Sequence, residues 1–310
     1  MNIREHGKLD RLDRKEGMQM SGGAIKEQVR EKHPCFGYAR NKGRIHLPVC
    51  PACNIECNFC DRKINTYEDR PGVTGEILTP EEAVDALKRA LEICPDISVA
   101  GIAGPGDTLA TNGAVDTFRL IGEQYPDVLK CMSTNGLLLN ERAEELIELG
   151  IDTLTVTVNA VDPAIEAQII SGIYYHGKRY EGEEGAGILI ENQLAGIRKM
   201  AAAGVTIKVN TVLIMEINRH HIRDIAKAVS EAGATMYNII PLIPQHKFKD
   251  LAEPECVDID GARREAEEYI DVFRHCQRCR ADAVGIPGQK DYGDQIYLKR
   301  LNPKDTFSHG

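Results

Sequence analysis

Two things are scarce in this sequence: tryptophan, which is absent, and positive charge. Among 310 residues, Lys and Arg number 38 against 47 Asp and Glu, so the formal net charge is −9. An acidic chain argues against a broad nucleic-acid-binding surface. The sequence also lacks the ~18 consecutive apolar residues of a membrane span, and its charged first residues do not resemble a secretory signal. We therefore expect a cytoplasmic protein that binds neither nucleic acid nor a membrane.

Cysteine is the unusual component that is present. The chain has ten cysteines, an even number that could suggest disulfides. Disulfide frameworks belong to short secreted chains, whereas a chain of this length can bury a core without them. In a reducing cytosol, clustered cysteines more often bind metals or iron–sulfur clusters. The composition therefore favours a metal site.

Short apolar runs alternate with helical patterns from about residue 43. Strands are expected over residues 44–49, 97–103, 128–132, 151–158, 205–215 and 235–240. Helices are expected over residues 79–94, 140–150, 190–203, 219–232 and 261–274, with another opening at Asp162-Pro163 and a glycine-rich interruption over 180–187. Alternation of this kind indicates a parallel sheet of the α/β class. Six strands predict a partial (β/α)6 barrel rather than a full eight-stranded one.

The unusual residues gather directly after the expected strands. Functional groups in such folds sit on the loops at the C-terminal strand ends. The corresponding segments are residues 50–63, 104–107, 133–136, 159 and 241–246. We therefore expect the functional site at this edge of the sheet.

The first of these segments carries Cys53, Cys57 and Cys60 in a C-x3-C-x2-C pattern. Three thiolates on one tight loop can bind three irons of a [4Fe–4S] cluster and leave the fourth iron open, whereas closed clusters normally use four cysteines. An open iron suggests that a substrate or cofactor binds there. Structural zinc is the alternative, because Cys50 extends the run to C-x2-C-x3-C-x2-C and zinc favours paired C-x2-C motifs.

With Phe59 between its last two cysteines, this motif resembles the signature of the radical S-adenosylmethionine (SAM) superfamily. The resemblance implies a six-stranded partial barrel and a cluster held by Cys53, Cys57 and Cys60. It also implies that SAM chelates the open iron and is cleaved by one electron to a 5′-deoxyadenosyl radical. Solvated, turn or capping roles fit the strand-end residues equally well, but by position the candidates for binding SAM are Phe59, Gly106, Asp107, Thr134, Asn135, Asn159, Asn210 and Thr211.

Motifs outside the three-cysteine set Cys53, Cys57 and Cys60, called the triad below, narrow the resemblance to one part of the superfamily. His33-Pro34-Cys35 precedes the barrel, Cys131 lies at a strand end, and residues 275–282 read HCQRCRAD. Together they resemble the members of the superfamily that build the nitrogenase cofactor, over roughly residues 20–290. That resemblance implies fusion of two further [4Fe–4S] clusters into an eight-iron, nine-sulfur carbide precursor, with SAM as methyl donor and radical source. The implied ligands of these clusters are His33, Cys35, Cys131, Cys276 and Cys279. Cys50, Cys94 and Cys256 are expected to be inert.

We expect three parts: an N-terminal arm over residues 1–42, the barrel over 43–250 and a C-terminal tail over 251–310, with the arm and the tail carrying the extra ligands. The resemblance implies three kinds of partner, namely iron–sulfur cluster donors, a reductant such as ferredoxin or flavodoxin, and a cofactor scaffold protein. The last is expected because many bacterial relatives have a further carrier-like domain where this chain ends. Two alternatives remain: a radical SAM enzyme with one auxiliary cluster, like the molybdopterin precursor synthase, and a non-catalytic iron–sulfur carrier or zinc module.

Overall fold

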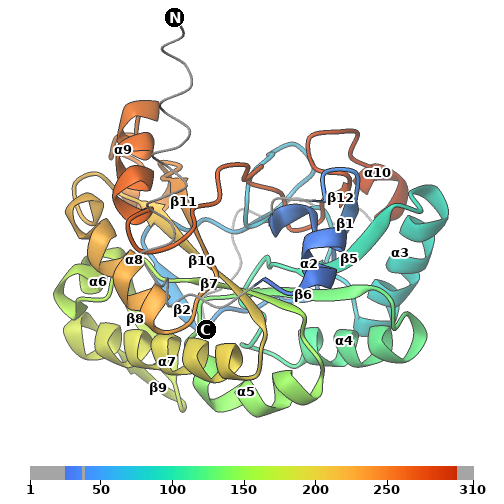
Figure 1. The fold of residues 1–310 in the computed structure, drawn as a ribbon, viewed down its shortest axis with the longest axis horizontal. Coiled ribbons are helices and arrows are strands. Elements are labelled where there is room, and N and C mark those ends of the chain that lie inside the picture. Colours follow the sequence, from blue (N-terminus) through green and yellow to red (C-terminus); the bar gives the residue numbers. More distant parts are fainter. Residues whose placement is uncertain (1–24, 37–38, 299–310) are drawn as a thin grey trace, which may run out of the picture.

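Six parallel strands form a curved sheet in the computed structural model, which describes residues 25–36 and 39–298. The order β11-β10-β7-β6-β5-β1 confirms the predicted partial barrel (Figure 1). A short seventh strand, β12 (Val284–Gly285), pairs antiparallel with β1. Two residues carry no periodic pattern, so this strand was not predicted. The parallel strands are β1 (Gly43–His46), β5 (Ile97–Ile102), β6 (Leu129–Thr134), β7 (Thr153–Thr157), β10 (Thr206–Leu213) and β11 (Met236–Pro241).

Helices ring the outside of this sheet (Figure 1). The helix predicted after Thr79 is α3, where the Thr79 hydroxyl accepts from the backbone N–H of Glu82 and the Glu82 carboxylate accepts from that of Thr79. This reciprocal capping box satisfies two backbone donors that lack helical partners. The helices are α2 (Glu27–Lys32), α3 (Pro80–Ile93), α4 (Gly113–Gln124), α5 (Leu139–Glu148), α6 (Pro163–Ile169), α7 (Gly182–Ala202), α8 (Ile222–Glu231), α9 (Cys256–Ala266) and α10 (Gly293–Ile296), with 3-10 turns η1 (Pro34–Phe36), η2 (Arg219–His221) and η3 (His246–Phe248).

Two helices begin earlier than predicted. The glycine-rich residues 182–187 belong to α7, because their small size lets the helix approach its surroundings; a Cβ on Gly185 would lie 2.9 Å from the carbonyl oxygen of Tyr180. The last helix, α9, spans Cys256–Ala266 rather than residues 261–274. Its start is set by a capping box between Glu255 and Asp258, a signal that the helical period alone did not reveal. The helix predicted over residues 140–150 is α5, in which Asn140 is the second residue rather than the N-cap.

A small antiparallel sheet supports the cysteine loop. It consists of β2 (Ile55–Cys57), β8 (Ile170–Tyr175) and β9 (Lys178–Tyr180), and a separate pair joins β3 (Lys63–Ile64) to β4 (Val73–Thr74). The backbone N–H of Tyr174 donates to the carbonyl of Asn54 at 2.8 Å, which extends the pairing of β2 with β8. The hairpin formed by β8 and β9 thus holds the first half of the cysteine motif.

In the described part of the chain, no helix is both long and apolar enough to cross a membrane.

Candidate functional site

The thiols of Cys53, Cys57 and Cys60 lie close together after β1. Burial raises the pKa of each, that of Cys53 to about 11, and the pKa of Cys57 is raised further by its two partners. Three neighbouring thiols that resist ionisation need a cationic partner before all can become thiolates. The guanidinium of Arg62 acts in that direction, because it lowers the pKa of all three against the effect of burial. The loop is suited to binding a metal cluster.

The segment after β5 is hydrogen-bonded to the start of the cysteine loop. The backbone N–H of Gly106 donates to the carbonyl of Cys50 at 2.8 Å, and that of Asp107 donates to Ala52 at 2.9 Å. A Cβ on Gly106 would lie 1.9 Å from the carbonyl oxygen of Ala52. Glycine is therefore required there by a close backbone approach, which explains Gly106 without a bound ligand.

Asp107 ties the end of β5 to the end of β6. Its buried carboxylate accepts from the Thr134 hydroxyl at 3.0 Å and from the backbone N–H groups of Asn135 at 2.6 Å and Leu109 at 2.9 Å. Burial raises the pKa of Asp107, and these hydrogen bonds oppose the rise. Asp107 and Thr134 are thus hydrogen-bonded to each other next to the cysteine loop.

Two side-chain amides lie against the triad. The Asn135 amide nitrogen lies 3.8 Å from the sulfur of Cys53 and donates to the Asn54 side-chain oxygen at 2.7 Å. The Asn54 amide nitrogen is buried and has no hydrogen-bond partner among the described residues. Hydrogen bonds to sulfur tune iron–sulfur clusters, so these donors and the three thiols fit a [4Fe–4S] cluster.

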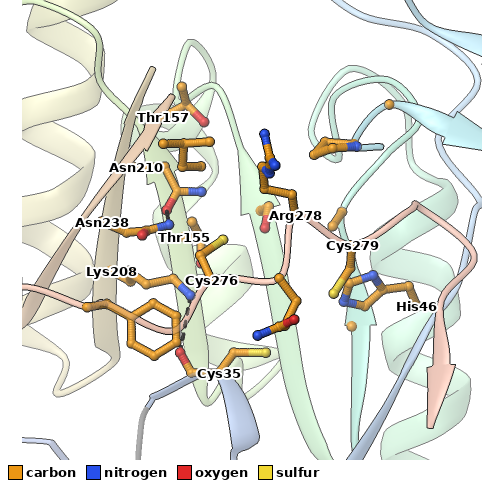
Figure 2. Close-up of a pocket in the computed structure, with 18 of the residues that line it drawn as sticks. Cys35, His46, Thr155, Thr157, Lys208, Asn210, Asn238, Cys276, Arg278 and Cys279 are labelled. Atoms are coloured by element: carbon orange, nitrogen blue, oxygen red, sulfur yellow. Dashed lines mark hydrogen bonds between the residues drawn. The ribbon is translucent and has the colours of Figure 1, made fainter. Parts of the chain in front are cut away.

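A cavity of about 380 Å³ adjoins the triad, because Phe59 and Cys60 are among the residues that line it. Figure 2 shows other parts of its lining, including Cys35, Cys276 and Cys279. Its lining comes from the N-terminal arm, the concave face of the sheet and the C-terminal segment. Every additional ligand candidate borders it, namely His33, Cys35, Cys131, Cys276 and Cys279. The structure therefore brings together residues that are up to 246 positions apart, from His33 to Cys279.

The cysteines outside the triad also affect one another's pKa. Burial raises the pKa of Cys35, and the neighbouring Cys279 and Cys276 raise it further. Burial likewise raises the pKa of Cys131 to about 11, and Cys35 adds to that rise. The Cys279 sulfur accepts from the Arg44 guanidinium at 3.0 Å. These four thiols form one group, distinct from the triad.

Of the three histidines that line this cavity, His33 and His46 differ in which ring nitrogen is available. The His33 Nδ1 accepts from the backbone N–H of Cys35 at 3.1 Å, so its neutral ring carries the proton at Nε2, which is buried and has no partner among the described residues. The His46 Nδ1 lies 2.9 Å from the carbonyl of Arg280 and must donate, because a carbonyl only accepts. Burial lowers the pKa of His46 to about 4, so Nε2 carries no proton and can accept. Metal-binding histidines typically donate their other ring N–H to a carbonyl or carboxylate in this way.

His46 was not among the ligand candidates predicted from the sequence. Its signal was its position, since it is the last residue of β1 and directly precedes the cysteine loop. Ligation by His33 through Nε2 would require its proton to move to Nδ1 and the Cys35 N–H to be released.

Strand alternation separates the two candidates on β10, and a third candidate, Asn159, follows the end of β7. Asn210 lines the cavity and accepts from the Asn238 amide at 3.0 Å. Thr211 points to the opposite face, as successive strand side chains do, and accepts from the Tyr237 hydroxyl at 2.8 Å. Asn159 accepts from the backbone N–H of Val212 at 3.0 Å. The last two side chains thus bond to the scaffold. Polar residues that line the cavity but were not predicted include Ser133, Thr155, Thr157, Lys208 and Asn238.

The three cysteines expected to be inert do not line the cavity. Cys50 and Cys94 are buried in the main hydrophobic core, and Cys256 is exposed at the start of α9.

Comparison with known proteins decides the family. The Radical SAM superfamily profile matches residues 47–229. The FeMo cofactor biosynthesis protein NifB of Methanocaldococcus infernus is 46% identical over 88% of this chain and 91% of that protein. The Methanocaldococcus jannaschii protein is 44% identical over 90% and 94%. The chain belongs to the NifB family. The Azotobacter vinelandii member of the NifB family is 40% identical over 89% of this chain but 57% of its own length.

The fold comparison agrees with the NifB assignment. A radical SAM methyltransferase from Sphaerobacter thermophilus superposes with a TM-score of 0.56 at 16% identity, covering 75% of this chain and 66% of that one. At this identity the likeness concerns the fold alone. As a NifB family member, the chain is a radical SAM enzyme of cofactor biosynthesis, and the family implies one [4Fe–4S] cluster and SAM. The buried thiols and amide donors at the triad suit that cluster.

Proposed function

We propose that the chain fuses two [4Fe–4S] clusters, bound in the cavity as substrates, into an eight-iron, nine-sulfur carbide precursor of the nitrogenase cofactor. SAM would serve as methyl donor and as radical source. The observation that supports this most is the group of four cysteines outside the triad that line one cavity, together with three histidines. Thiolates are the usual ligands of four-iron clusters, and imidazole also binds iron.

Cys53, Cys57 and Cys60 would hold the SAM-binding cluster, which supplies an electron for the reductive cleavage of SAM when both are bound. The chain's own contribution is position and environment. Asn54 and Asn135 present amide donors to that loop. Apolar residues of the cavity wall, including Val212 and Ile240, keep water away from the reacting groups.

The ligand set suits clusters that must later be released. Cys35, Cys131, Cys276 and Cys279 come from three separate segments, so each substrate cluster can lose ligands one at a time. His46 presents a neutral nitrogen, which dissociates from iron more readily than a thiolate. We therefore propose His46 beside His33 as a nitrogen ligand of one substrate cluster.

Iron counting tests the proposal. After anaerobic reconstitution, three four-iron clusters give about twelve irons per chain. About eight irons, together with deoxyadenosine formed in the presence of an organic substrate, would favour an enzyme with one auxiliary cluster. About four irons would overturn the reading with two substrate clusters. Zinc in the preparation, or spectra that SAM leaves unchanged, would favour the non-catalytic alternative.

The proposed partners follow from this chemistry. Cluster donors must load the cavity, a reductant such as ferredoxin or flavodoxin must supply electrons, and a nitrogenase cofactor scaffold protein must accept the product. Incubation of the loaded chain with a purified scaffold protein, followed by separation and iron analysis of each, would detect that transfer.

A further inference from the structure

The lining of the cavity carries positive charge. Among the described residues that line it, Arg44, Lys208 and Arg278 are cationic and none is Asp or Glu. Arg278 pairs with Glu253 at 3.7 Å, which lies outside the lining. Arg44 is engaged, since it donates to the Gly285 carbonyl at 2.7 Å and to the Cys279 sulfur. A cavity lined by one sign of charge attracts ligands of the opposite sign. Its occupant is therefore expected to be an anion.

Lys208 is the most enclosed of these cations apart from Arg44. It lies on β10 with 7% of its surface exposed, and its ammonium donates to the carbonyl of Cys35 at 3.3 Å (Figure 2). The ammonium also lies 4.9 Å from the ring centre of Phe36 and 5.1 Å from that of Phe273. An aromatic face attracts a cation less strongly than an anion does. A buried ammonium of this kind is costly unless a negative charge joins it.

The same ammonium lies beside the candidate ligands. It donates to the carbonyl of Cys35, and Lys208 lines the cavity together with Cys131, His33 and His46. A ligand bound by these side chains would therefore lie next to the positive charge of Lys208.

We infer that Lys208 is a positioning residue that holds the anionic substrate clusters in the cavity by supplying a fixed positive charge beside Cys35 and Cys131. This inference rests on the proposed function. A one-electron-reduced four-iron core carries a single positive charge, so two thiolate ligands give the whole cluster a single negative charge. It therefore supplies the counter-charge that the buried ammonium lacks.

Lys208→Met removes the charge while keeping an unbranched side chain, and Lys208→Arg retains the charge. Lys199→Met, at a partly exposed lysine on α7, is the matched control for loss of one positive charge. The measurements on anaerobically reconstituted protein are iron per chain, the rate of iron release to a chelator, and the midpoint potential of each cluster by paramagnetic resonance.

In Lys208→Met we expect the iron outside the triad to be released on the order of tenfold faster, because a charge interaction at low effective dielectric is lost. The potential of those clusters should shift to more negative values, since the lost charge stabilised their reduced form. The triad cluster should keep its iron and its potential. Lys208→Arg and Lys199→Met should behave like the unaltered protein.

Wild-type release rates and potentials in Lys208→Met would overturn the inference. If that variant fails to fold, Lys208→Gln, which retains a donor for the Cys35 carbonyl, takes its place. Loss of the triad cluster in both neutral variants would assign Lys208 a structural role and also overturn the inference. About four irons in the unaltered chain would instead overturn the proposed function, whatever the variants show.

Discussion

Glu166 is a buried carboxyl group with no cation beside it among the described residues. The effect of its replacement on the free energy of unfolding can therefore be calculated. The side chain lies on α6 with 1% of its surface exposed, accepts from the backbone N–H of Ala160, and leaves Oε2 without a partner among the described residues. Burial raises the pKa of Glu166 from 4.5 to about 8. The folded chain therefore keeps this proton across the range in which the unfolded chain releases it.

The sign of the pH dependence follows from this difference. Because the folded state binds the extra proton, the free energy of unfolding falls as the pH rises from about 4.5 to about 8. Each pH unit in that window costs about 1.4 kcal/mol. Glu166→Gln removes the titration but keeps an oxygen for the Ala160 N–H. The variant should thus be more stable than the unaltered chain by about 1 kcal/mol at pH 5 and by about 3 kcal/mol at pH 7.

Urea unfolding of the cluster-free chain, followed by circular dichroism under anaerobic conditions at several pH values, measures this difference. A stability gap that stays constant between pH 5 and pH 8 would refute the reasoning. Glu265→Gln is the control of opposite sign. Arg219 lowers the pKa of Glu265 through a hydrogen-bonded ion pair, so this substitution should destabilise the chain at neutral pH, with an effect that fades in acid.

Three further predictions concern the site. Asp107→Asn should lower the free energy of unfolding by about 2 kcal/mol, because its amide nitrogen would face a backbone N–H from which the carboxylate accepts and leave that buried donor without a partner; an unchanged urea midpoint would contradict this. Cys57→Ala should end deoxyadenosine formation, whereas Cys276→Ala should retain most of it and block the eight-iron product, so equal losses in a chromatographic assay would show that the two cysteines do not have separate roles. His46→Ala should remove the nitrogen coupling in pulsed paramagnetic resonance spectra, and loss of that coupling only in His33→Ala would assign the ligand to the other histidine.

The sequence alone was enough for the architecture, because local patterns carry it. Apolar runs and capping signals such as Thr79-Pro80 repeat along the barrel, and six strands were expected and observed. The C-x3-C-x2-C spacing indicated the cluster loop for the same reason, since its three ligands lie within eight residues. The positions after the strands also predicted the edge of the sheet at which the site lies.

Only the tertiary structure decided which polar residues face the cavity. Asn210 and Thr211 are adjacent in sequence, but strand alternation sends one toward the cavity and the other into the scaffold. His46 and Lys208 have no motif around them, and their environment comes from Arg280 and Cys35, which are distant in the chain. Burial, charge and hydrogen-bond partners arise from contacts between remote segments, so no local pattern in the sequence encodes them.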